Sequence, residues 1–159
     1  MRIGKGEWAQ QMKGNLAQGI IRDFVESYKA EAKLLKEVIE YTERSEKLAT
    51  EGNYAALYDC LLGRGERIEA IAQLETKRAK LEKEFAGRIH EDIKEARDQA
   101  LIAHGEAILA NNQLRTVLAE HKAILEEERA ALENNKTAAH AYDGVNDTSS
   151  VSMFLDRER

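Results

Sequence analysis

The chain has 159 residues, enough for a single domain, and a formal net charge of −5 with both signs mixed along its length. This mild acidity argues against a nucleic-acid-binding protein, which would present a basic face. Hydrophobic residues make up 43%, charged residues 33% and aromatic residues 6%, and proline is absent. That composition is typical of long helices and coiled coils.

The first 19 residues predict a weakly ordered segment, because Gly4, Gly6 and Gly14 lower helix propensity. A strong helix is expected over residues 20–49. Its seam alternates spacings of four and three, which is a heptad pattern: Ile21, Val25, Tyr28, Ala32, Leu35, Ile39 and Thr42. Phe24, Leu34 and Val38 widen this seam into the broad face expected of a helix in a bundle. The turn that follows contains Gly52, which suits a left-handed helix C-cap, and Asn53, which suits an N-cap.

The second helix is expected over residues 54–86. Its seam is irregular because three of its positions are charged, namely Arg64, Glu75 and Arg78. Gly63 and Gly65 lie inside this helix and predict a local weakness or a close helix crossing.

The third helix is expected over residues 91–139, with Gly87 as the favoured join and an unbroken helix as the alternative. Its stripe is alanine-rich in the first half and bulkier in the second: Ile93, Ala96, Ala100, Ala103, Ala107, Ala110, Leu114, Val117, His121, Ile124, Glu128 and Ala131. Alanines allow helix backbones to approach closely. The predicted fold is therefore all-α, an elongated antiparallel bundle of about three long, coiled-coil-like helices over residues 20–140.

Residues 141–159 predict a flexible C-terminal tail, because Tyr142-Asp-Gly144 is a turn signal and the stretch after it is polar. The tail carries a small apolar cluster at Val151, Met153, Phe154 and Leu155. This cluster either folds on contact with a partner or tucks against the bundle.

Catalytic and metal-binding motifs are missing from the sequence. His90-Glu-Asp-Ile-Lys94 lacks the second histidine of a zinc-protease motif, and no Glu-x-x-His motif occurs. Cys60 is the only cysteine and is expected to be a small core residue. We therefore expect no enzyme, cofactor or metal. The lone cysteine, with no signal-peptide core and no membrane-length apolar run, favours a cytoplasmic protein without membrane insertion.

The run Leu48-Ala-Thr-Glu-Gly-Asn-Tyr-Ala-Ala-Leu57, with Leu61-Leu62 and Leu74-Glu-Thr-Lys-Arg78, resembles flagellar type III export chaperones of the FlgN/FliT kind. Ala110-Asn-Asn-Gln-Leu-Arg115 and the ending with Tyr142, Ser150 and Phe154-Leu-Asp156 are similar to FlgN-like members in particular. The resemblance covers residues 20–159. Gly63, Gly65 and Gly105 depart from the family pattern.

The resemblance implies a chaperone that binds terminal helices of late flagellar subunits, prevents premature assembly and delivers them to the export apparatus. Its partners would be hook–filament junction (hook-associated) proteins or the filament cap protein, and components of the export gate or ATPase. The expected partner-binding residues are Leu114, Val117, His121, Ile124, Leu125, Tyr142, Val151, Met153, Phe154 and Leu155. Two alternatives are a structural homo-oligomeric coiled coil, such as a homodimer, and a histidine phosphotransfer bundle, which the sequences around His90 and His104 favour less.

Overall fold

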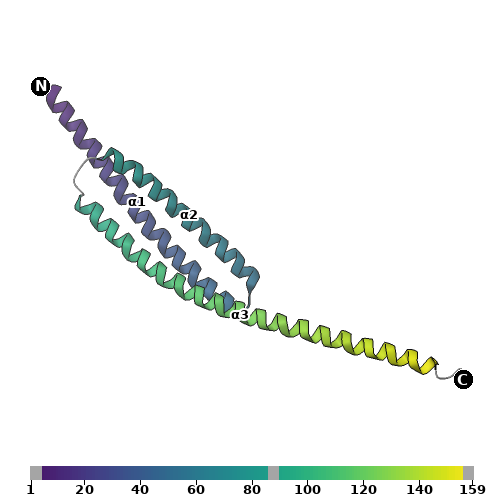
Figure 1. Cartoon of the computed structure of the whole chain (residues 1–159). Helices are drawn as coiled ribbons and strands as arrows, with labels where there is room; N and C mark the ends of the chain where they lie inside the picture. The colour runs from purple at the N-terminus through teal and green to yellow at the C-terminus, as the bar shows by residue number, and fades with distance from the viewer. Residues whose placement is uncertain (1–4, 86–89, 156–159) are drawn as a thin grey trace. The chain divides into compact units, whose positions relative to one another are not determined.

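The computed structural model describes the backbone of residues 5–85 and 90–155, and the side chains of 10–11, 13–85 and 90–142. It contains three long helices in this part of the chain: α1 (Lys5–Thr50), α2 (Tyr54–Glu84) and α3 (Glu91–Leu155) (Figure 1). The expected all-α fold of three long helices is confirmed. Among the described helices, none is long and apolar enough to cross a membrane.

The turn between α1 and α2 forms as the sequence predicts. Gly52 adopts a positive φ of 70°. The N–H of Gly52 donates to the carbonyl of Ala49, and the N–H of Asn53 donates to that of Leu48. This pair of bonds is the Schellman motif that ends many helices. The Asn53 side chain then accepts a hydrogen bond from the N–H of Ala56 at 3.3 Å and caps α2.

The chain divides into two compact units, residues 1–117 and 118–159. Within the first unit, α1, α2 and the first part of α3 form an antiparallel bundle. α2 runs antiparallel to α1. Cys60, near the start of α2, hydrogen-bonds to Tyr41, and Arg78, further along α2, pairs with the earlier residue Glu31. α3 runs parallel to α1, because His104 contacts Glu31 and the later residue Gln113 contacts Glu46.

The bundle core is thin and combines bulky and small side chains. Its central cluster contains Leu35, Val38, Ile71 and Ala103. Of the α3 stripe predicted from sequence, Ile93, Ala96, Ala100, Ala103 and Leu114 are buried. Cys60 is buried as expected, and its thiol donates to the carbonyl of Tyr41 at 3.3 Å. Phe24 and Phe85 pack edge to face, with ring centroids 6.1 Å apart.

The buried face of α1 agrees in part with the prediction. The buried positions are Phe24, Ser27, Glu31, Leu35, Val38, Thr42, Ser45 and Ala49. Phe24, Leu35, Val38 and Thr42 were predicted, whereas apolar periodicity alone misses the polar positions Ser27, Glu31 and Ser45. The hydroxyls of Thr42 and Ser45 donate to backbone carbonyls four residues earlier, which satisfies them inside the core.

The helix ends also differ from the sequence expectation. α1 begins at Lys5 rather than near residue 20, α2 ends at Glu84, and α3 continues to Leu155 rather than ending at residue 139. Without proline, the residues after Tyr142 each cost a helix no more than about 0.7 kcal/mol, or about 1 kcal/mol at Gly144. The predicted join at Gly87 lies outside the described residues.

Candidate functional site: an exposed helical stripe and a buried polar cluster

The second unit contains an amphipathic helical segment of α3 whose apolar side chains face solvent. Every residue from Lys122 to Tyr142 is exposed. The apolar members include Leu132 and Tyr142, with exposed fractions of 62% and 71%. The residues of this exposed stripe repeat at heptad spacing on one side of the helix: Ile124, Leu125, Ala131, Leu132, Ala138, Ala139 and Tyr142.

The predicted partner-binding residues divide into three groups. Ile124, Leu125 and Tyr142 are exposed and belong to the exposed stripe. Val117 and His121 are half-buried. Leu114 is only 2% exposed, because it packs in the core of the first unit, and is therefore unavailable to a partner. The four remaining residues lie in the last turns of α3, where side chains are not described: Val151, Met153, Phe154 and Leu155.

The charged residues around the exposed stripe are mostly acidic. Between residues 118 and 142 the carboxylates are Glu120, Glu126, Glu127, Glu128 and Glu133, and the basic residues are Lys122, Arg129 and Lys136. Glu128 lies on the apolar side, between Leu125 and Leu132 in the heptad pattern. Parallel pairing of two copies would bring Glu128 opposite its own copy, and like charges in a coiled-coil seam are destabilising.

A second cluster lies inside the first unit and is polar. Glu31 on α1 has a side chain that is 3% exposed. Arg78 from α2 forms an ion pair with Glu31, in which Nη2 lies 2.5 Å from Oε2. His104 from α3 places Nε2 2.7 Å from Glu31 Oε1. All three helices therefore meet at this one carboxylate.

Arg78 is held in place by two further contacts. Its Nη1 donates to the Ser27 hydroxyl at 3.2 Å, and its guanidinium lies 4.2 Å from the centre of the Tyr28 ring. A buried ion pair gives little net stability, but leaving one member unpaired is costly. This network therefore fixes the register of α2 against α1.

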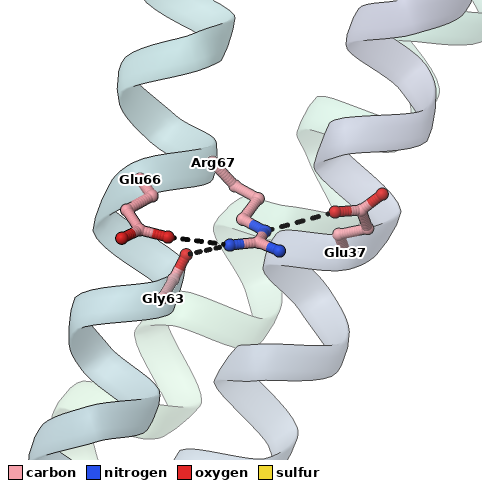
Figure 2. A network of polar contacts seen from close by, with 4 residues as sticks. All are labelled: Glu37, Gly63, Glu66 and Arg67. Atoms are coloured by element: carbon pink, nitrogen blue, oxygen red, sulfur yellow. Dashed lines mark hydrogen bonds and ion pairs between the residues drawn. The ribbon is translucent and has the colours of Figure 1, made fainter.

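Partly exposed polar contacts extend this arrangement towards the α1–α2 turn. Arg67 on α2 donates from Nε to Glu37 on α1 at 3.2 Å, and from Nη1 to Glu66 and to the carbonyl of Gly63 (Figure 2). Its guanidinium also lies 4.9 Å from the centre of the Tyr41 ring. These contacts join α1 and α2 beside Gly63, where the two helices approach closely.

An apolar groove opens beside the polar cluster, with a volume of about 340 Å³. Its floor includes Leu35 and Val38 of α1, and its sides include Ile68 of α2 and Ile108 of α3. Glu75 and His104 also line it. Sequence reasoning placed Glu75 and Arg78 on the α2 seam but interpreted them as an irregularity, and it missed Glu31. The heptad spacing does indicate Glu31, because it lies seven residues from both Phe24 and Val38.

Comparisons of the chain with protein-family models, with curated proteins and with solved structures found no match.

Proposed function

We propose that this chain is a cytoplasmic helix-binding protein whose partner packs against the exposed stripe of α3. The observation that carries this proposal is the run of exposed apolar residues at heptad spacing from Ile124 to Tyr142. A helix with one apolar face gains stability by burying that face against another element. Contiguous exposed apolar surface marks interaction sites in soluble proteins.

The mode of binding would be packing of two amphipathic helices, with anchors on both at spacings of three and four residues. Each fully buried leucine or isoleucine contributes roughly 1.5–3 kcal/mol of transfer free energy. The exposed stripe has three such residues, Ile124, Leu125 and Leu132, and Tyr142 as an aromatic anchor. Together they are comparable with the cost of association, which is on the order of 4–15 kcal/mol. In this proposal the exposed stripe binds a partner helix and has no catalytic role.

The resemblance to FlgN/FliT-type export chaperones supplies the identity of the partner in this proposal. The client is a terminal helix of a late flagellar subunit, with a hook–filament junction protein favoured over the filament cap protein. The chain keeps that helix from assembling prematurely and delivers it to the export apparatus. Tyr142 and the last turns of α3 are the candidate contacts with the export components.

A second function, a structural homodimer, is favoured by one specific observation. Leu118, Leu125 and Leu132 are spaced by seven residues, which is the pattern of a self-paired coiled coil. Glu128 in the same seam opposes parallel self-pairing, so a different partner helix is the better occupant.

The test is a binding measurement with matched variants. Leu125→Glu places a charge in the exposed stripe, and Ala130→Glu places the same charge on the opposite side of the helix at another exposed position. Each chain is titrated with terminal-helix peptides of a junction protein and of the cap protein. The parent chain and Ala130→Glu should bind one of these two peptides with equal affinity. Leu125→Glu should lose at least about tenfold, the equivalent of 1.4 kcal/mol.

Failure of both peptides to bind would reject the flagellar client. A parent chain that forms a defined dimer at micromolar concentration, with Leu125→Glu monomeric, would favour the structural homodimer instead.

A further inference from the structure

One metal-ligating side chain from each helix of the bundle converges on the polar cluster. Glu31 comes from α1, Glu75 from α2 and His104 from α3. A carboxylate oxygen or ring nitrogen of each lies within 4.8 Å of the others. Nε2 of His104 lies 2.7 Å from Oε1 of Glu31.

We propose that these three residues bind a divalent transition metal ion, with zinc as the best-suited metal. Imidazole nitrogen and carboxylate oxygen are the ligand types that zinc takes in proteins, at about 2.0–2.2 Å. Ligand atoms at that distance in a tetrahedral site lie about 3.4 Å apart. Glu31 and His104 therefore separate slightly as the ion enters, and the exposed Glu75 side chain rotates towards it.

The buried state of Glu31 supports this site independently of the cluster itself. Its side chain is only 3% exposed, and its two oxygens contact different groups, Oε2 the Arg78 guanidinium and Oε1 the His104 ring. An ionised carboxylate offers about four lone-pair sites. One polar contact on each oxygen leaves lone pairs of Oε1, on the side of His104, for a metal ion.

Arg78 would act as a positioning residue for the site. It holds Oε2 of Glu31 from the side away from His104, as outer partners hold metal-bound carboxylates in other proteins. Together, Glu31, Glu75 and Arg78 carry a net charge of −1 when the imidazole is neutral, so a dication is attracted to the cluster. The adjoining groove reaches Glu75 and His104 and leaves room for water as a fourth ligand.

This inference does not depend on the proposed function. It is tested by titrating the full chain with Co²⁺, a spectroscopic stand-in for zinc, and following the visible absorption of the metal. The expected result is a band that saturates at one equivalent and disappears on addition of Zn²⁺. Zn²⁺ should also raise the thermal midpoint of the parent chain, because a ligand that binds only the folded state stabilises it.

Glu75→Gln and His104→Gln should each raise the dissociation constant for Co²⁺ at least about tenfold, the scale on which even supporting residues of metal sites act. Glu75 is exposed, so its variant should keep the parent circular-dichroism spectrum and remain informative if His104→Gln is less well folded. His140→Gln, at an exposed histidine of the second unit, should bind as the parent does. The proposed site would be overturned if Co²⁺ binding did not saturate, or if Glu75→Gln bound Co²⁺ with the affinity of the parent. It would also be overturned if only His140→Gln lost affinity for Co²⁺.

Discussion

The most constrained residue of the α1–α2 contact is a glycine. A Cβ atom on Gly63 would lie 2.7 Å from Cε1 of Tyr41, whereas one on Gly65 would meet nothing within 4 Å. We therefore expect Gly63→Ala to destabilise the chain by about 1–3 kcal/mol through overpacking. Gly65→Ala should stabilise it by about 0.5–1 kcal/mol through backbone entropy. Urea unfolding measures both, and Tyr41→Ala should abolish the cost at Gly63 if the clash is its cause.

The buried ion pair gives a second prediction at the residue scale. Arg78→Met leaves Glu31 in the core without its counter-charge, which should cost about 3–5 kcal/mol of unfolding free energy. Arg129→Met removes an exposed pair with Glu133 four residues later and should cost no more than about 0.5 kcal/mol. Both are read from urea unfolding curves. Equal costs in the two variants would mean that Glu31 is reached by water.

At the scale of elements, α3 is one continuous helix with two different environments. Up to Leu114 it contributes buried side chains to the bundle, and from Lys122 to Tyr142 all its side chains are exposed. Most helical stability in proteins comes from packing, so the part of α3 without buried side chains lacks the main source of that stability. This fits the predicted flexible C-terminal end, although its backbone is helical to Leu155.

Hydrogen exchange should resolve this difference along α3. We expect amides between Ala96 and Leu114 to exchange at rates near those of global unfolding, and amides between Lys122 and Tyr142 to exchange many orders of magnitude faster. A partner helix bound to the exposed stripe should slow the second group and leave the first unchanged. Uniform protection along the whole helix of the monomeric chain would contradict this picture.

The elements also show what a single sequence can predict. The α3 stripe was found because Ile93, Ala96 and Ala100 are apolar and correctly spaced. The buried face of α1 was predicted only in part, because Ser27 and Glu31 are polar, and periodicity of apolar residues cannot show that a distant arginine pairs with a buried glutamate. For the same reason, periodicity could not predict that Glu75 and His104 converge, because they are 29 positions apart and meet only after the helices pack. Ile124, Leu125 and Tyr142 of the exposed stripe were named from the sequence, whereas Leu132, Ala138 and Ala139 were not.

At the scale of the whole molecule, the buried core and the exposed stripe proposed to bind a partner lie in different units. The hydrophobic cluster of Leu35, Val38, Ile71 and Ala103 lies wholly within residues 1–117, as does the polar cluster at Glu31. The exposed stripe begins after His121 and carries no buried side chain between Lys122 and Tyr142. A chain ending at His121 should therefore fold on its own.

Thermal unfolding followed by circular dichroism checks this division. The shortened chain should keep the midpoint of the cooperative transition within a few degrees, because a change of 1 kcal/mol moves the midpoint by roughly 4–8 °C in a domain of this size. Its total helical signal should fall in proportion to the residues removed, and its affinity for a partner helix should vanish. A fall in the midpoint well beyond that range would show that the second unit contributes to the fold, and stability and binding would then be properties of the same surface.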